Sequence, residues 1–282
     1  MAPLNLSGNY PGFWDPITST LDWCEKNYEI NYYVAEFWNT LSNFTFIIQP
    51  LMAYYRLHRL KLPFLYYCPL FYLSFVGMGS LFFHMTLKYE MQLWDELAMM
   101  GEALLLCFIQ IKIMSPEKAE RIITKAALIA VGLITCGIYI ILNQPVIFQI
   151  CFASVHYFIV YLGYRLTRLY SCSPKLFWSS IFFNHFAFLL WNVDNNFCGG
   201  LENIRTQIPS LLIPVTQLHA VWHVLAGFAT LSFSFFVIHV HLLRTNRFHY
   251  IHFDLLSGWK FVPAREMASK NGENSQMTSK TS

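Results

Sequence analysis

The sequence of residues 211–243 is LLIPVTQLHAVWHVLAGFATLSFSFFVIHVHLL, a run without Asp, Glu, Lys or Arg. A membrane-spanning helix needs about 20 apolar residues, so this run can cross a bilayer with tilt or continue past it. It also carries His219 and His223 near one end of the run. Imidazoles at membrane depth are rare and mark functional sites by default. The stretch therefore predicts a membrane protein with a site inside its bundle.

Six further apolar runs accompany this one, and the chain as a whole has the composition of a membrane protein. It is 55% hydrophobic and only 12% charged, whereas soluble domains are about 25% charged. We predict an all-α, seven-transmembrane helix bundle over residues 34–245, between an N-terminal segment (1–33) and a largely disordered C-terminal tail (246–282). The six other predicted spans are Val34–Arg56, Phe64–Met85, Met91–Lys112, Ile122–Leu142, Val146–Leu169 and Leu176–Phe197.

The distribution of basic residues predicts the orientation. Sixteen of the nineteen Lys and Arg residues fall in segments on one side of the bundle, and only Lys26, Lys88 and Arg205 fall on the other. The positive-inside rule places the basic side in the cytosol. We therefore expect a lumenal or external N-terminus and a cytosolic C-terminus. The polar N-terminus is not typical of a cleavable signal, and the net charge of +3 gives no case for nucleic-acid binding.

Two of the seven cysteines, Cys24 and Cys198, fall on the predicted oxidising side of the membrane. Disulfides persist in such compartments, so a Cys24–Cys198 bond is expected. It would tie the N-terminal segment to the loop after the sixth span. The alternative is a pair of free thiols, because a sequence does not supply the distance that a disulfide requires.

Ionisable and hydroxyl side chains gather at the lumenal ends of several spans. Ser80 and His84 lie one turn apart at the end of the second, Asp95 lies near the start of the third, and His219 and His223 share one face of the seventh. Three imidazoles with an open fourth position form a catalytic zinc set, in which the open position holds water. The shared depth predicts a zinc site here.

Other polar residues of the spans have plainer interpretations. His185, alone in the sixth span, is expected to be a hydrogen-bonded packing residue. Asn192, Asp194 and Asn195 are expected to form hydrogen bonds between helices. Glu102 in the third span could support the zinc site or pair with a neighbour, and the sequence leaves both open.

A second group of oxygen-bearing residues precedes the first span and consists of Asp22, Trp23, Glu25, Asn27 and Glu36. Calcium takes six to eight oxygen ligands, and these residues are compatible with such a site. They do not form an EF-hand, because the repeating acidic pattern and its glycine are missing. On spacing alone, a solvated acidic segment is the alternative.

At these positions the sequence resembles the alkaline ceramidases, and most of all their alkaline phytoceramidase (type 3) branch. The resemblance extends over roughly residues 10 to 245 and follows the order of the family's motifs. The run after His84 is the one that favours the type 3 branch. The segments that carry the resemblance are STLDWCEKNY (19–28), AEFWNT (35–40), VGMGS (76–80), FHMTLKYEMQ (83–92) with Asp95-Glu96, Trp191-Asn192 with Asp194-Asn195, and QLHAVWH (217–223).

The resemblance implies an intramembrane zinc amidase of the endoplasmic reticulum or Golgi. Such an enzyme cleaves ceramide, phytoceramide or dihydroceramide to a sphingoid base and a free fatty acid, and has a calcium site beside the catalytic one. The expected partners are thus the lipid substrate and the bilayer. By matching motif, zinc would be held by His84, His219 and His223, the catalytic water flanked by Ser80 and Asp95, and calcium held by Asp22, the Trp23 carbonyl, Glu25, Asn27 and Glu36.

Two other functions compete with a ceramidase. A zinc-containing seven-helix receptor of the progestin and adipoQ type is the main alternative, but that class usually places its N-terminus in the cytosol. A cation transporter would need polar groups through the full thickness of the membrane. The clustering at one membrane face argues against it.

Overall fold

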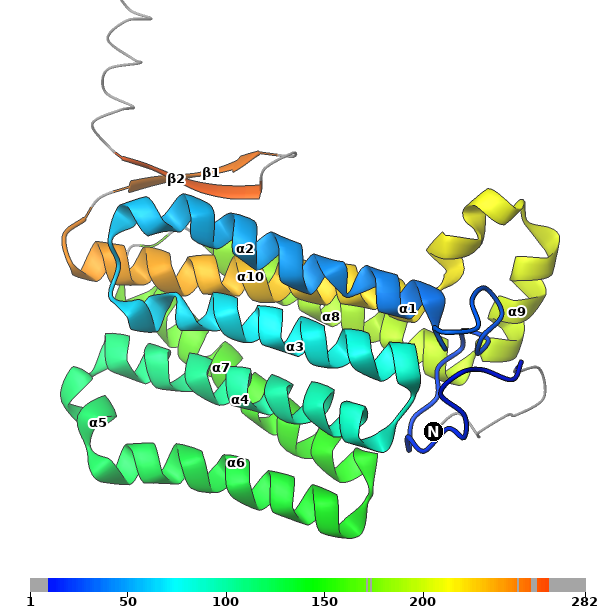
Figure 1. The fold of residues 1–282 in the computed structure, drawn as a ribbon. Helices are drawn as coiled ribbons and strands as arrows, with labels where there is room; N and C mark the ends of the chain where they lie inside the picture. Colours follow the sequence, from blue (N-terminus) through cyan, green and yellow to red (C-terminus); the bar gives the residue numbers. More distant parts are fainter. Residues whose placement is uncertain (1–9, 171, 173, 248, 255–257, 264–282) are drawn as a thin grey trace, which may run out of the picture.

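The computed structural model describes residues 10–170, 172, 174–247, 249–254 and 258–263. The ends of the two predicted terminal segments, residues 1–9 and 264–282, lie outside the described residues. Long helices run side by side and form one bundle (Figure 1). Six helices of the described chain are long and apolar enough to cross a membrane: α3 (Cys68–Thr86), α4 (Tyr89–Met114), α6 (Ile122–Leu142), α7 (Pro145–Leu169), α8 (Pro174–Asn196) and α10 (Leu218–Arg244).

The segment predicted as the first span forms two helices, α1 (Phe37–Ser42) and α2 (Phe44–Leu57). They follow one another along α10 (Figure 1). The division falls at Asn43, whose side-chain amide donates to the Asn39 carbonyl at 2.9 Å. Ser42 also donates to that carbonyl, and such local bonds compete with a regular helix. Neither helix is long enough to cross alone, so the count of seven spans stays a prediction.

The predicted last span begins later than its apolar run. Residues Ser210–Thr216 form the 3-10 helix η3, which contains Pro214, and α10 starts only at Leu218. Proline lacks a backbone N–H, so the run does not continue as one α-helix from Leu211. The remaining short elements are η1 (His58–Leu60), η2 (Phe64–Tyr66), α5 (Pro116–Glu120) and α9 (Cys198–Gln207).

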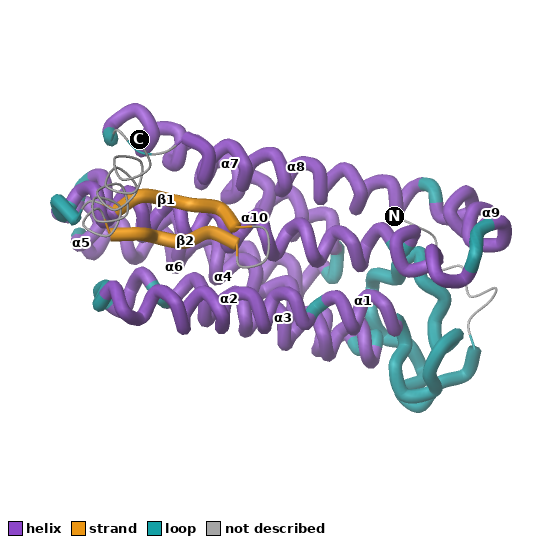
Figure 2. Tube along the Cα trace, turned by 90° about the horizontal axis from the view of Figure 1, so that it is seen from above, coloured by secondary structure: helices purple, strands orange, loops and turns teal. Residues whose placement is uncertain are grey.

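A two-stranded antiparallel hairpin follows α10, formed by β1 (His249–Asp254) and β2 (Gly258–Pro263). It lies at the opposite end of the bundle from α9 (Figure 2). The Trp259 indole N–H donates to the Ser232 hydroxyl of α10 at 2.9 Å, and the Phe261 ring stacks on Phe235. The prediction of an all-α fold is therefore confirmed for the bundle and wrong for these two strands.

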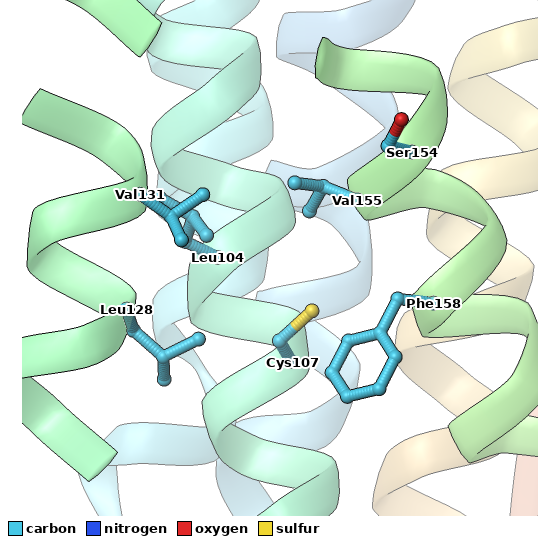
Figure 3. Close-up of a pocket in the computed structure, with 7 residues that line it drawn as sticks. All are labelled: Leu104, Cys107, Leu128, Val131, Ser154, Val155 and Phe158. Atoms are coloured by element: carbon cyan, nitrogen blue, oxygen red, sulfur yellow. The ribbon is translucent and has the colours of Figure 1, made fainter. Parts of the chain in front are cut away.

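Helix α6 lies at one edge of the bundle (Figure 1) and exposes large apolar side chains such as Ile141, which is 81% exposed. A membrane would cover this face. A small pocket of about 240 Å³ lies between α4, α6 and α7, and its lining is mainly apolar (Figure 3). None of the predicted site residues lines this pocket, whose only polar or sulfur-bearing side chains are Cys107 and Ser154. The predicted zinc site therefore lies elsewhere in the bundle.

Candidate metal centre and active site

The structure brings His84, His219 and His223 together. His84 lies near the end of α3, and the other two lie in the first two turns of α10. All three are buried, and each offers a ligand atom within 4.8 Å of those of the others. Among the described residues this is the only such group of three His, Cys, Asp or Glu side chains. The trio could hold a metal ion.

The end of α3 is fixed by the N-terminal segment. Leu87 follows α3 in the left-handed region with φ 49° and turns the chain toward α4. Beside this turn, the Ala35 N–H donates to the Met85 carbonyl at 2.9 Å, and the Glu36 N–H donates to the His84 carbonyl at 3.0 Å. The segment before α1 therefore holds the backbone of His84 in place.

Glu36 also contacts the His84 ring. Its Oε2 atom lies 2.5 Å from His84 Nδ1 and accepts a 3.0 Å hydrogen bond from the Asn39 side-chain amide. Its Oε1 atom accepts from the Trp23 N–H at 3.2 Å. A carboxylate on one ring nitrogen orients a histidine ligand and leaves the other nitrogen for a metal. Glu36, predicted as a calcium ligand, is thus a direct support of His84.

The other two histidines also fit a metal. His223 Nδ1 lies 2.7 Å from the Ser42 hydroxyl, and its Nε2 lies 3.5 Å from the Ser80 hydroxyl. His219 Nδ1 is buried and has no hydrogen-bond partner in the described chain. Such an orphaned atom is costly, unless a ligand uses it. Two supported rings and one orphaned nitrogen form a donor set that suits a metal ion.

Trp23 contacts the ring of the third histidine, and Asp194 contacts its backbone. The Trp23 ring stacks on His219, with centroids 3.7 Å apart and planes 19° apart. Asp194 accepts from the His219 N–H at 3.3 Å and from the Cys24 N–H at 3.1 Å. The expected bonding between segments is confirmed for Asp194. It is wrong for Asn192 and Asn195, whose amides donate to carbonyls of their own helix, α8.

Ser80 and Asp95 face each other across the contact between α3 and α4. The Asp95 carboxylate has the Ser80 hydroxyl as a hydrogen-bond partner. Gly79 permits this approach, because a Cβ atom at position 79 would lie 3.1 Å from the Asp95 backbone nitrogen. Both side chains line the cavity that also reaches His219. The two predicted catalytic residues therefore lie beside the histidines.

The cavity has a volume of about 540 Å³ and extends from His219 between α4, α7, α8 and α10. Its lining is mostly apolar. Ile150, Tyr157 and Phe188 line it and are also more than half exposed, so it reaches the outer surface of the bundle between α7 and α8. His185 lines it too, and its Nδ1 bonds the Ile181 carbonyl of its own helix at 2.8 Å. An apolar cavity open toward lipid suits a lipid ligand.

Comparison with known proteins identifies the family. The family model described as Ceramidase matches residues 15–265. This chain belongs to the ceramidase family. It is 36% identical over 233 residues to Alkaline ceramidase 3 of Mus musculus, covering 82% of this chain and 87% of that protein. It is 28% identical to Alkaline ceramidase YPC1 of Saccharomyces cerevisiae, with 90% and 85% covered.

Family membership makes this ceramidase a hydrolase. Family membership therefore favours a hydrolase over the two alternatives, a receptor and a cation transporter. A further relative, Alkaline ceramidase of Arabidopsis thaliana, is 29% identical over 233 residues, covering 79% of this chain and 84% of that protein.

In this ceramidase the predicted calcium ligands lie close to the three histidines but do not converge as tightly as the histidines do. Glu25 accepts hydrogen bonds from the N–H groups of Trp38 and Asn39 at 2.7 and 2.9 Å, and so caps the start of α1. Asn27 donates its side-chain amide to Asp22 at 3.1 Å. Burial raises the pKa of Asp22, and it raises the pKa of Glu25 to about 7. A nearby cation would offset this cost.

Two interactions at Cys24, a disulfide bond and a hydrogen bond, attach the N-terminal segment of the ceramidase to the bundle. The predicted disulfide to Cys198 is present, with Cα atoms 5.2 Å apart. Arg205 of α9 donates to the Cys24 carbonyl at 2.8 Å and to the Thr216 carbonyl at 2.9 Å. Sequence reasoning missed this role of Arg205. The signal was its isolation, since few basic residues lie on this side of the bundle.

Proposed function

We propose that this member of the ceramidase family is a zinc-dependent amidohydrolase. It hydrolyses the amide bond of ceramide-type lipids, which releases a sphingoid base and a free fatty acid. One observation carries the proposal: His219, which clusters with His84 and His223, lines one apolar cavity together with Ser80 and Asp95, and this cavity reaches the outer surface of the bundle. The names of the relatives support the same substrate class.

The zinc ion would be held by His84, His219 and His223. When bound, it supplies Lewis-acid polarisation of the amide carbonyl and makes water a stronger nucleophile at neutral pH. The donor set favours zinc among the common metals, because imidazole ligands suit it and three protein ligands leave a position open. Glu36 and Ser42 orient two of the rings through their Nδ1 atoms.

In the proposed mechanism, Asp95 moves the protons of the reaction. As general base it takes a proton from the attacking water while the water oxygen bonds to the amide carbon. It then returns this proton to the amide nitrogen as the carbon–nitrogen bond breaks, which leaves an amine and a carboxylic acid. The Ser80 hydroxyl lies beside both Asp95 and His223. Once Asp95 has taken the proton from water, the Ser80 O–H no longer has to donate to the carboxylate and can donate to the developing oxyanion.

The cavity determines how the lipid reaches these groups. Its opening between α7 and α8 lets the two hydrocarbon chains stay in an apolar environment while the amide moves to Asp95. Apolar walls also exclude bulk water, and electrostatic interactions are stronger in a dry site. The substrate does not have to leave the membrane.

We further propose that calcium binds the N-terminal segment through Asp22, the Trp23 carbonyl, Glu25, Asn27 and Glu36. The support is the chemistry of the donors, because buried carboxylates and an amide oxygen are ligands that calcium prefers. Since Glu36 contacts His84 and the Trp23 ring stacks on His219, calcium would act by positioning the metal centre.

The proposed location is the endoplasmic reticulum or Golgi membrane, with a lumenal N-terminus and a cytosolic C-terminus. The asymmetry of basic residues supports this orientation. The disulfide supports it as well, because Cys24 and Cys198 lie at the proposed lumenal side.

A direct assay tests the activity. Purified protein is incubated with ceramide, phytoceramide and dihydroceramide, and the released base is measured by mass spectrometry. We expect release by the wild type and none by a variant in which all three histidines are alanine. Equal release by the two proteins, or no release from any of the lipids by metal-loaded wild type, would refute the proposal.

A further inference from the structure

Glu102 is a buried acid that the proposed chemistry does not use. It lies in the middle of α4, is 6% exposed, and lines the same cavity as Asp95. Its Oε1 atom has no hydrogen-bond partner within the part of the chain that the structure describes. The sequence left its role open between support of the metal centre and pairing with a neighbour. The structure shows neither contact.

The position of Glu102 on α4 relates it to the reacting centre. It follows Asp95 by seven residues, which is two helical turns, so both lie on the same face. The separation along the helix axis is about 10 Å. Met99 lies between them and Leu106 follows, and both line the cavity. Glu102 therefore lies deeper in the bundle than Asp95, and its carboxyl faces the space that the first carbons of the lipid chains next to the amide would occupy.

A second buried acid of α4, Glu96, has hydrogen-bond partners within the bundle. Glu96 is also buried and lines the cavity. It accepts hydrogen bonds from the Tyr139 hydroxyl of α6 and from the Gln92 side-chain amide. An unsatisfied carboxyl oxygen in an apolar cavity is costly. The contrast between the two acids indicates that the partner of Glu102 is supplied by a ligand.

We propose that Glu102 binds a hydroxyl group carried on a lipid chain beyond the amide head, and so determines specificity for hydroxylated substrates. This inference rests on the proposed function, because it assumes that a ceramide-type lipid fills the cavity. A carboxyl oxygen accepts a hydrogen bond from a hydroxyl group, and a lipid hydroxyl can take the position that a water molecule would otherwise occupy. The hydroxyl can belong to the sphingoid base, as at its carbon 4, or to carbon 2 of the acyl chain.

A site built to bond a hydroxyl discriminates strongly against a lipid without it, because the buried polar group is then left unpaired. Removal of the carboxyl should therefore lower kcat/KM for the hydroxylated lipid by about tenfold or more. The same change should leave the matched lipid without that hydroxyl unaffected or improve its hydrolysis. This difference between two substrates separates a contact to the lipid from a merely structural role.

The experiment compares wild type with Glu102→Gln and Glu102→Leu. The substrates are dihydroceramide, its counterpart with a 4-hydroxylated base, and its counterpart with a 2-hydroxylated acyl chain, all of one chain length. We expect Glu102→Leu to lose the preference for one hydroxylated lipid, which identifies the source of the hydroxyl. Glu102→Gln, which keeps a hydrogen-bonding oxygen, should retain most of the preference. Equal effects of Glu102→Leu on all three lipids, or no effect, would overturn the inference.

A binding measurement keeps the inference distinct from the proposed function. Thermal stabilisation of each protein is measured with sphinganine and 4-hydroxysphinganine, and with a fatty acid and its 2-hydroxy form. If the wild type hydrolyses no ceramide, the proposed function fails, but stronger stabilisation by one hydroxylated lipid that Glu102→Leu abolishes still supports the contact. Identical stabilisation by hydroxylated and plain lipids in wild type and Glu102→Leu overturns it.

Discussion

The Oε2 atom of Glu36 lies 2.5 Å from Nδ1 of His84, although Glu36 directly precedes α1 and His84 lies near the end of α3. The same carboxylate accepts hydrogen bonds from Trp23 and Asn39. One side chain thus joins the N-terminal segment, the start of α1 and the group of three histidines. Any change that moves this segment changes the orientation of His84.

Replacement of Glu36 should weaken the metal centre without removing a zinc ligand. Glu36→Ala leaves His84 Nδ1 without its acceptor, and loss of such a partner typically costs about 10- to 100-fold in metal affinity or activity. Zinc content and turnover measured at limiting zinc test this. Glu29, an exposed acid of the same segment, supplies the control, and Glu29→Gln should behave as wild type. Normal zinc affinity and turnover in Glu36→Ala would show that His84 needs no support.

Replacement of the ligands themselves should separate metal binding from proton transfer. His84→Ala, His219→Ala and His223→Ala should each lose zinc and hydrolysis, because three ligands leave no redundancy. Asp95→Asn should keep the zinc and lose most turnover, since the amide cannot take a proton from water. Metal analysis beside lipid hydrolysis gives both readings. His58→Ala, an exposed histidine distant in the chain, should change neither, and a fully active Asp95→Asn enzyme would contradict this role.

A side chain at Gly79 should separate Ser80 from Asp95. Its Cβ atom would lie 3.1 Å from the Asp95 backbone nitrogen and 2.9 Å from the Trp94 ring, so α3 and α4 must move apart. We expect Gly79→Val to lower turnover at least tenfold, as small misplacements of catalytic groups do, while the three histidines still bind zinc. The control is Gly137→Ala in α6, where nothing lies within 4 Å of the added atom. Unchanged turnover in Gly79→Val would show that this close approach is dispensable.

The disulfide should contribute to stability through the long loop that it closes. Cys24 and Cys198 are 174 residues apart, and chain entropy gives a loop of this length at most about 4–5 kcal/mol. Cys24→Ser and Cys198→Ser should each lower the melting temperature. The double variant should have the same melting temperature as the single variants. A double variant much less stable than either would mean that the thiols act separately. Mass spectrometry of alkylated native protein checks that both sulfurs are blocked in the wild type.

Calcium removal should loosen the N-terminal segment and reduce activity indirectly. A chelator that binds calcium but spares zinc should lower both the melting temperature and turnover of the wild type, and added calcium should restore them. Asp22→Ala should lower both in the same way and respond less to calcium. Elemental analysis of the purified protein measures the ion directly. If no calcium is found and chelation changes neither quantity, the acidic segment has only a structural role.

The part of the site that lies on regular helices could be predicted from the sequence. His219 and His223 are four residues apart, which places them on one helical face, and the alternation of spans gives His84 the same depth. The supporting contacts could not be predicted in this way. Glu25 caps α1 and Ser42 contacts His223 because the N-terminal segment folds back onto the bundle, and no periodicity encodes the path of an irregular segment.

Some helix boundaries could likewise be predicted from the sequence, and others could not. The ends of α6 and its apolar composition follow from the sequence, because about 20 apolar residues between polar ones define a span. The division at Asn43 was not predicted, since it depends on side-chain bonds to Asn39 that compete with the helix. The strands after α10 were also missed. Trp259 contacts α10 there, and such a tertiary contact is not encoded in the periodicity of a short segment after the last span.

The three histidines come from distant parts of the chain, and the last of them, His223, lies in the final helix of the bundle. The residues that contact two of these rings, Glu36 and Ser42, lie near the N-terminal end of the chain. A nascent polypeptide consequently has no complete centre until α10 has emerged from the ribosome and entered the membrane. Under the proposed function, a chain that ends before His223 cannot hydrolyse lipid, so activity would report that α10 has been synthesised and inserted.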